Sequence, residues 1–340
     1  MKSAAALASI LVLGACNALS LKTPSKDCAR SPERAARVEE LLVVGHRGAA
    51  KHAVENTVPS MVRALADGAN AVEIDLSLTK DGVVVLWHDW DPNDAVARAR
   101  QEGQEPDQLA RPRVPADGDS MRRPVHELTL DELRRHYGYV VDGRPAEAEI
   151  PTLEQFLDWA VAEPDLAYVL FDLKIPAALA DRADIVVPHV RDAVTSRGAR
   201  FRYVFLTPHV PVYDRASALV PDDALSFDVD PGAVVASSVD CKEASSARAV
   251  RRGRGYASTV APVGVEAEAW HTLQELLVCD LTARDRTEPT SKPTKVFAAT
   301  INDPDELGCL VDVGVDGIVT DDPSVLRRIQ ILRKPAPGPQ

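Results

Sequence analysis

Side chains that bind metal ions, bind anions or transfer protons gather at the ends of four apolar runs in this chain of 340 residues. In chain order they are His46 with Arg47, Glu73 with Asp75, His88 with Asp89, and Asp172 with Lys174. Carboxylate oxygens suit Mg²⁺ or Ca²⁺, a guanidinium matches phosphate oxygens, and two imidazoles can divide the proton transfers of a hydrolysis. Together these residue types suit metal-assisted acid–base chemistry on an anionic substrate.

These residues require a fold that brings the ends of strands together. Eight short apolar runs, mostly separated by helical patterns, are predicted as strands: 41–45, 71–76, 83–88, 168–174, 203–207, 224–228, 296–301 and 317–321. Such alternation indicates a parallel sheet covered on both faces, and eight strands indicate an α/β fold of the (β/α)8 TIM-barrel type. The carboxyl ends of barrel strands form one mouth, and residues two apart on a strand point the same way. We therefore expect the four groups to meet there.

Two segments are too long for ordinary loops. The first, about 91–149, is expected as an insertion after the third strand, over one mouth of the barrel. The second is a long segment between the sixth and seventh strands, about 230–293. One link also departs from the alternation, because "SLTKDG" (77–82) between the second and third strands is too short for a helix.

The first residues are predicted to be a targeting signal rather than part of the fold. Lys2 precedes an apolar run, and the order Leu13-Gly14-Ala15-Cys16 resembles a bacterial lipobox. We expect a signal peptide over 1–15 with cleavage before a lipidated Cys16, a polar tether over 16–40, the barrel over 41–333 and a disordered tail over 334–340. The protein would then be exported and anchored in a membrane of a bacterial cell envelope. An ordinary signal peptide with an incidental Cys16 is the alternative.

The net charge limits the expected binding partners, and the cysteines indicate which disulfides to expect. A net charge of −12 argues against nucleic acid and anionic membrane surfaces as bulk partners. Export permits disulfides, and Cys241 with Cys279, which flank a loop-rich segment, is the expected pair. Cys309 lies in an amphipathic stretch and is interpreted as a small buried residue. The cysteine spacing does not indicate a zinc site, and the sequence leaves the oligomeric state open.

Five stretches resemble the glycerophosphodiester phosphodiesterase family: "GHRGAAKHAVENT", "GANAVEIDLSLTKDGVVVLWHD", "PVHELTLDEL", "IPTLEQFL" and "GVDGIVTDDP". They extend over the barrel from about Leu41 to Arg328, with the long segments unmatched. The resemblance implies a barrel of this kind, one divalent cation (Mg²⁺ or Ca²⁺) and hydrolysis of a small or lipid-derived glycerophosphodiester to glycerol 3-phosphate and an alcohol.

The resemblance also implies roles by position. His46 and His88 match the catalytic pair, Glu73 and Asp75 match metal ligands, and Arg47 and Lys174 match cations that bind the phosphate. Asp172 stands where the family usually has a third, glutamate ligand, and Ala299 where it commonly has a tryptophan, which implies a wider headgroup pocket or one filled from an insertion. We also expect Gly48 to let the backbone approach the phosphate, and Asn56 to be a loop or capping residue.

Two other functions remain open at this point. One is a phospholipase D-type or sphingomyelinase D-like enzyme, which shares the barrel, the metal and two histidines but acts on lysophospholipids and forms a cyclic phosphate. The other is a non-catalytic, anion-binding lipoprotein. The stretches "ENT" and "TKDG" favour the glycerophosphodiesterase, and His46, Glu73, Asp75 and His88 together favour an enzyme.

Overall fold

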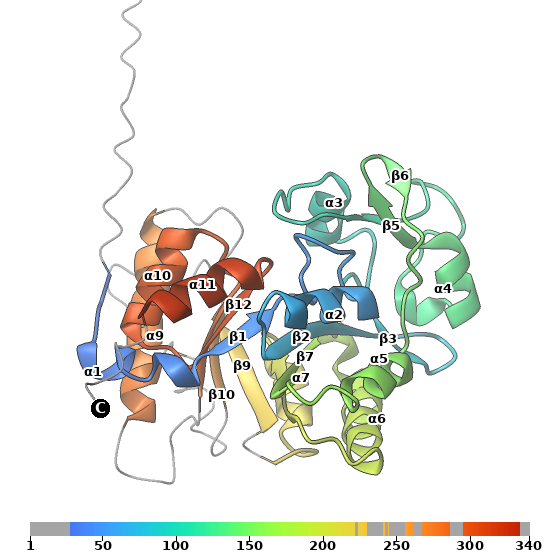
Figure 1. Ribbon diagram of the computed structural model, residues 1–340. Helices are drawn as coiled ribbons and strands as arrows, with labels where there is room; N and C mark the ends of the chain where they lie inside the picture. Colours follow the sequence, from blue (N-terminus) through green and yellow to red (C-terminus); the bar gives the residue numbers. More distant parts are fainter. Residues whose placement is uncertain are drawn as a thin grey trace, which may run out of the picture.

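Eight parallel strands form a closed ring in the computed structural model, which describes residues 28–221, 224–229, 241, 244, 256–260, 267–285 and 295–333. In ring order the strands are β1 (Leu42–Gly45), β2 (Ala71–Leu78), β7 (Tyr168–Leu173), β8 (Arg202–Thr207), β9 (Leu225–Val229), β10 (Tyr256–Val260), β11 (Val296–Ala299) and β12 (Gly317–Thr320). Strand β1 pairs with both β12 and β2, which closes the ring (Figure 1). The prediction of a (β/α)8 barrel is thus confirmed.

The membership of the ring differs from the prediction at one strand. The run at 83–88 forms β3 (Val84–Leu86), which pairs antiparallel with β2 and lies outside the ring. The short link before it permits only this arrangement, because a parallel neighbour needs a crossover of about a dozen residues or more. The missing parallel strand is β10, inside the long segment between the predicted sixth and seventh strands. Its sequence, "YASTV", has no apolar run to reveal it.

Helices cover the outside of the ring: α2 (Val58–Ala66), α5 (Leu153–Ala160), η3 (Ala177–Arg182) with α6 (Ala183–Ser196), α7 (Val210–Ala216), α9 (Ala267–Arg284), α10 (Pro304–Val313) and α11 (Pro323–Arg333). Short polar side chains begin several of them. The hydroxyl of Thr57 accepts from the backbone of Ser60, and Thr152 forms a reciprocal capping box with Gln155. The main core lies between these helices and the outward faces of the strands.

A smaller apolar cluster fills the inside of the ring. It consists of Leu42, Val44, Ala71, Tyr168, Leu170, Val204, Leu206, Phe297 and Val319. Because side chains alternate along a strand, the positions that follow on the same inward face of β2 and β7 are Glu73, Asp75 and Asp172. The apolar cluster therefore closes the interior of the barrel, and the predicted metal ligands lie next to it, nearer the carboxyl ends of the strands.

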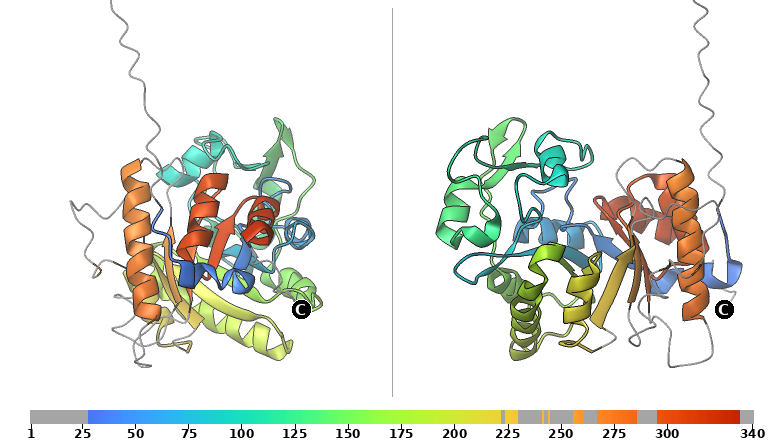
Figure 2. Two further views of the ribbon diagram at one scale, coloured as in Figure 1. Left: turned by 60° about the vertical axis from the view of Figure 1, so that its left-hand side comes forward. Right: turned by 180° about the vertical axis from the view of Figure 1, so that it is seen from behind.

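The expected insertion after β3 is present and has a core of its own. It contains α3 (Ala95–Gln101), η2 (Val125–Glu127), α4 (Leu130–His136) and a three-stranded antiparallel sheet of β4 (Arg111–Arg113), β5 (Gly138–Val141) and β6 (Arg144–Pro145). Figures 1 and 2 show it as a lobe beside α2, β2 and β3. Trp87, Tyr137 and Tyr139 pack together in its core, so the lobe is built on residues next to β3.

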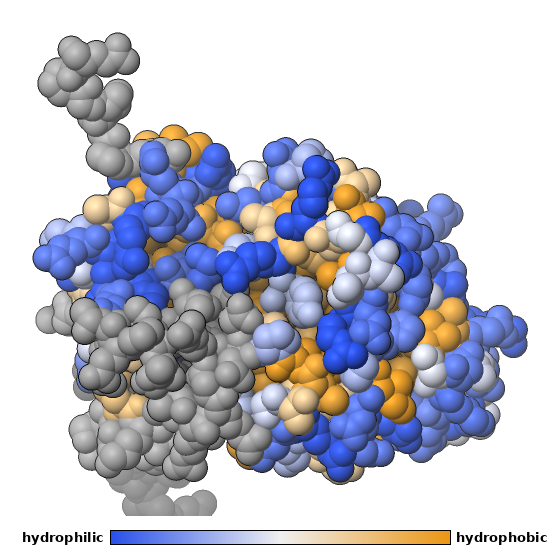
Figure 3. Space-filling model, turned by 90° about the horizontal axis from the view of Figure 1, so that it is seen from below, coloured by the Kyte–Doolittle hydropathy of each residue, from blue (hydrophilic) through white to orange (hydrophobic). Residues whose placement is uncertain are grey.

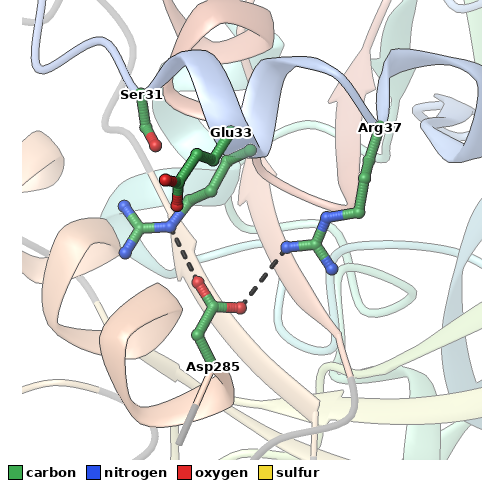
Figure 4. A pocket seen from close by; sticks show the side chains of 5 residues that line it. Ser31, Glu33, Arg37 and Asp285 are labelled. Atoms are coloured by element: carbon green, nitrogen blue, oxygen red, sulfur yellow. Dashed lines mark hydrogen bonds and ion pairs between the residues drawn. The ribbon is translucent and has the colours of Figure 1, made fainter.

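The N-terminal segment differs from the expected tether from residue 28 onward. Cys28 forms a disulfide with Cys309 on α10, which corrects the interpretation of Cys309 as an unpaired buried residue. Then α1 (Pro32–Ala35) and η1 (Val38–Glu40) follow, and Val38 is buried against the core. Figure 4 shows Arg37 of this segment paired with Asp285, which also binds Arg34, at a small surface pocket. These contacts hold 28–40 on the barrel.

The second disulfide joins Cys241 to Cys279 on α9, the pair that the sequence analysis expected. The expected signal peptide (1–15), the first part of the expected tether (16–27) and the expected tail (334–340) lie outside the described residues. Within the described part, none of the helices has the length and apolar character that a membrane crossing requires. Seen from below, hydrophilic side chains cover much of the surface and separate the apolar patches (Figure 3).

Candidate active site

Three carboxylates from two neighbouring strands lie together at the mouth of the barrel. Glu73 and Asp75 belong to β2 and Asp172 to β7, and Asp75 is directly opposite Asp172 in the strand register. One oxygen from each lies within 4.8 Å of the others, and all three side chains are buried. The structure thus brings together the three residues that the resemblance names as metal ligands.

The crowding of these three carboxylates favours the binding of a cation. One oxygen of each carboxylate, Glu73 Oε1, Asp75 Oδ1 and Asp172 Oδ1, is buried without a hydrogen-bond partner among the described residues. Burial and the neighbouring Asp75 raise the pKa of Glu73 to about 8, and burial also raises the pKa of Asp172. Three carboxylates that bring one oxygen each within 4.8 Å of the others form the donor set of a hard divalent cation, so these residues fit the metal that the family implies.

Two fixed cations also contact the acidic group. The Lys174 ammonium contacts Asp172 and lies 3.6 Å from Asp75, with about a quarter of its side chain exposed. Arg47 Nε lies 2.9 Å from Asp75. Burial opposes ionisation of Asp75, but Arg47 and the other nearby positive charges outweigh it and hold the pKa of Asp75 well below its usual range. Asp75 is therefore the most firmly ionised of the three.

Each predicted catalytic histidine is held by a carboxylate. His46 follows β1, and its Nδ1 lies 2.7 Å from Asp321 Oδ1 while its Nε2 lies 3.9 Å from Glu73. His88 follows β3, and its Nδ1 lies 2.6 Å from Asp89 Oδ1. A carboxylate at Nδ1 fixes the plane of the ring and directs Nε2 as the atom for proton exchange.

The surroundings push the two rings in opposite directions. Burial and Arg47 disfavour protonation of His46, but Asp321 and Glu73 outweigh them and raise its pKa. Burial, Arg47 and Arg100 lower the pKa of His88 well below its usual value. Two rings with separated pKa values can hold a proton on one and leave the other as a base, which is the division that acid–base catalysis needs.

The loop after β1 has a left-handed backbone at Arg47 (φ 49°) and Gly48 (φ 90°), and the backbone N–H of Arg47 donates to Glu73. A Cβ on Gly48 would lie 2.2 Å from the hydroxyl of Ser60. Packing against α2 therefore requires this glycine, which is a reason different from the expected approach to phosphate.

The Arg47 guanidinium is buried among Asp75, Glu55 (2.7 Å) and Glu105 (3.3 Å) rather than facing open space.

Sequence reasoning missed the residues that hold the site from behind. Asn56, expected as a loop or cap residue, donates from Nδ2 to Asp75 (2.8 Å) and accepts the Asp75 backbone N–H at Oδ1. Its left-handed φ of 54° is one that asparagine tolerates, but the sequence does not show this angle. Asn302 holds Asp321 through Nδ2 (2.6 Å) and Oδ1 (2.9 Å). Arg100 comes from the insertion, where no motif marked it.

Comparison with known proteins gives consistent matches. Residues 46–221 match the model of the glycerophosphoryl diester phosphodiesterase family. The probable glycerophosphodiester phosphodiesterase 2 of Mycobacterium tuberculosis is 24% identical over 306 residues, which is 86% of this chain and 91% of that protein. A glycerophosphodiester phosphodiesterase of Caldanaerobacter subterraneus is 48% identical, but over 48 residues, so the chain matches only 20% of its length.

Solved structures share the fold. A putative glycerophosphoryl diester phosphodiesterase from Silicibacter pomeroyi has a TM-score of 0.60 at 24% identity, covering 86% of this chain and 94% of that one. A phosphodiesterase from Oleispira antarctica, in complex with the product sn-glycerol-3-phosphate, has a TM-score of 0.56 at 18% identity, covering 86% and 98%. At these identities the likeness is one of fold.

The pKa of Glu73 predicts how cation binding depends on pH. A carboxylate must be deprotonated to bind a metal, so below a pKa of about 8 a proton competes with the cation. The apparent affinity for Mg²⁺ or Ca²⁺ should therefore rise about tenfold per pH unit up to about pH 8 and then level off, with proton release on binding. Calorimetric titration across this range measures both, and a pH-independent affinity would contradict the prediction.

Asp172 should be a direct ligand despite its short side chain. Asp172→Asn should weaken cation affinity by well over tenfold, or more than about 1.4 kcal/mol. Asp172→Glu should retain binding because it restores the carboxylate length that is usual in the family. The matched control is Asp165→Asn, an exposed carboxylate near the start of the same strand. Cation titration decides, and an affinity unchanged in Asp172→Asn would remove Asp172 from the ligand set.

Proposed function

The chain belongs to the glycerophosphoryl diester phosphodiesterase family, and we propose that it hydrolyses glycerophosphodiesters to glycerol 3-phosphate and an alcohol. One observation carries the proposal: three buried carboxylates that fit a cation lie at the same mouth as two histidines, each with a carboxylate at Nδ1. The family membership supplies the substrate class, and the Oleispira relative with bound sn-glycerol-3-phosphate supports the product.

One divalent cation, Mg²⁺ or Ca²⁺, would be held by Glu73, Asp75 and Asp172. When bound, such an ion neutralises the charge of the phosphodiester and makes phosphorus a better electrophile. The chain's own contribution is to keep the ligands fixed before the ion arrives. Asn56 holds Asp75 at both its backbone and its carboxylate, and the Arg47 backbone N–H holds Glu73 at 2.9 Å.

His46 and His88 would divide the proton transfers. One ring accepts a proton from the attacking oxygen as the new P–O bond forms, and the other donates a proton to the alkoxide as the old P–O bond breaks. The attacking oxygen is that of water in hydrolysis. Asp321 and Asp89 stabilise whichever ring carries the proton and keep each Nε2 aimed at the mouth.

Lys174 and Arg47 are the proposed phosphate-binding cations, and their settings differ. Lys174 is the more accessible, with 27% of its side chain exposed against 4% for Arg47. We therefore assign the first contact with phosphate to Lys174. The Arg47 guanidinium reaches phosphate by exchanging one of its present carboxylate partners, of which Glu105 is the most exposed.

The deciding experiment is turnover of glycerophosphocholine with Mg²⁺ or Ca²⁺, followed by ³¹P NMR. Release of glycerol 3-phosphate and choline supports the proposal. A cyclic phosphate from a lysophospholipid, with glycerophosphocholine untouched, would favour the phospholipase D-like alternative. Binding of the diester without turnover of any diester would favour the anion-binding alternative.

The histidines give the sharpest kinetic prediction. His46→Ala and His88→Ala should each lower kcat by about 10²- to 10⁴-fold while cation binding persists, because the proposed ligands are carboxylates. The wild-type pH profile should be bell-shaped, with limbs that belong to the pair. His189→Ala, an exposed histidine paired with Glu154 on the helical shell, is the control. Near-normal kcat in folded, cation-bound His46→Ala would overturn the assignment.

We also propose that the protein is exported and anchored through a lipid on Cys16. The order Leu13-Gly14-Ala15-Cys16 supports this proposal. The disulfides Cys28–Cys309 and Cys241–Cys279 support export, because such bonds persist in oxidising compartments.

Cys16→Ser should prevent lipidation and therefore processing. The variant should accumulate as precursor or leave the membrane fraction. Cell fractionation with detection of the precursor measures this result, and Ser20→Ala, a substitution that follows the lipobox and leaves both disulfides intact, is the control. Membrane partitioning and processing that match the unaltered protein would rule out Cys16 as the anchor.

A further inference from the structure

The insertion places one buried cation against the site. Arg100 lies near the end of α3, and only 2% of its side chain is exposed. Its guanidinium contacts three carboxylates: Glu55 on the loop before α2, Asp89 after β3, and Glu105 on the loop after α3. Burial opposes its charge, but these carboxylates outweigh that effect and raise its pKa further. Arg100 is therefore a permanent charge shared between the insertion and the barrel.

The contact with Asp89 continues to His88. Asp89 Oδ2 accepts from Arg100 at 2.7 Å, and Asp89 Oδ1 faces His88 Nδ1 at 2.6 Å. We propose that Arg100 is a positioning residue for His88, acting through Asp89, so that the insertion takes part in building the active site. This inference rests on the proposed role of His88 in proton transfer.

The geometry explains why an arginine suits this place. A carboxylate that binds an imidazole through one oxygen can still rotate, and a donor on the second oxygen fixes its plane. A guanidinium presents several donors in a rigid plane, so it can hold Asp89 and Glu55 at once. A lysine at this position would keep the charge but has no such fork.

The other histidine has the same arrangement with a neutral donor. Asn302 Nδ2 donates to Asp321 Oδ2, and Asp321 Oδ1 faces His46 Nδ1. Each ring is thus oriented by a carboxylate whose second oxygen is held by a side chain from another part of the chain. Asn302 comes from the loop after β11, and Arg100 comes from the insertion.

A role limited to attaching the insertion would not require this residue. The lobe already packs on the barrel through Trp87, Tyr137 and Tyr139. Burying the charge of Arg100 costs free energy of hydration, so this residue is not needed to attach the lobe. Two of the three carboxylates around Arg100 also connect it to the proposed phosphate-binding Arg47, because Glu55 and Glu105 contact both arginines. Arg100 therefore lies behind both a proton-transfer residue and a phosphate-binding residue.

The test compares Arg100→Gln and Arg100→Lys with Arg98→Gln. Arg98 is on the same helix, but it is 45% exposed and pairs with the exposed Asp117. We expect Arg100→Gln to lower kcat on the order of 10²-fold with a much smaller change in KM, because a displaced proton-transfer group affects the reaction more than binding. Arg100→Lys should recover part of the loss. Adding Arg100→Gln to Asp89→Asn should cost little further, because both act along one path.

Histidine ring NMR gives a readout that does not depend on activity. In ¹⁵N-histidine-labelled protein, His88 should be protonated at Nδ1 in the wild type and in Arg98→Gln, and should become a mixture of tautomers in Arg100→Gln. If Arg100→Gln does not fold, the same measurements on Arg100→Lys and Asp89→Asn decide.

The outcomes separate the two proposals. Normal kcat in folded Arg100→Gln, or a His88 spectrum unchanged by the substitution, would overturn the positioning role. A loss confined to thermal stability would also overturn it and leave Arg100 as a brace for the insertion. A wild-type protein without turnover whose His88 tautomer still changes in Arg100→Gln would contradict the proposed function while upholding the contact.

Discussion

Negative charge confined at the mouth of the barrel is the constraint on which the rest of the site depends. Glu73, Asp75 and Asp172 lie side by side in a buried position, where like charges repel and water cannot screen them. Arg47 and Lys174 neutralise part of this charge. One oxygen on each carboxylate still lacks a hydrogen bond in the described structure. That remaining negative potential is what can draw a divalent cation, and with it an anionic substrate, to a protein whose net charge is −12.

The charges around this centre form a layered order. Next to the carboxylates are Arg47 and Lys174, and behind Arg47 are Glu55 and Glu105. Arg100 then balances these two acids together with Asp89. Because Arg47 and Arg100 each contact several carboxylates, removal of either one weakens several buried ion pairs at once. This interdependence explains how the barrel and the insertion come to share one polar network although their apolar cores are separate.

Most of the centre could be predicted because strand geometry is visible in sequence. Glu73 and Asp75 share a face because they are two residues apart on a strand. The position of Asp172 directly opposite Asp75 was not visible, because the run at 83–88 was expected to lie between these two strands in the ring. The residues behind them could not be found this way. Arg100 and Glu105 belong to a lobe whose placement depends on its own packing, and Asn56 appears as an ordinary loop residue until its backbone conformation is known. The sixth strand of the ring, β10, was hidden because its Ser and Thr positions break the apolar pattern.

The bond between Cys28 and Cys309 has a mechanical meaning if the chain is held at Cys16. Eleven residues lie between Cys16 and Cys28, so this segment, fully extended, spans at most about 40 Å. A force applied along that segment is transmitted first through the disulfide to α10, before it acts on α1, η1 or the short strand β1. Strand β1 carries His46 at its end and closes the ring, so tension is kept off the seam beside the catalytic mouth. If Cys16 carries the proposed anchor, the disulfide therefore transmits an applied force to α10 before it reaches β1.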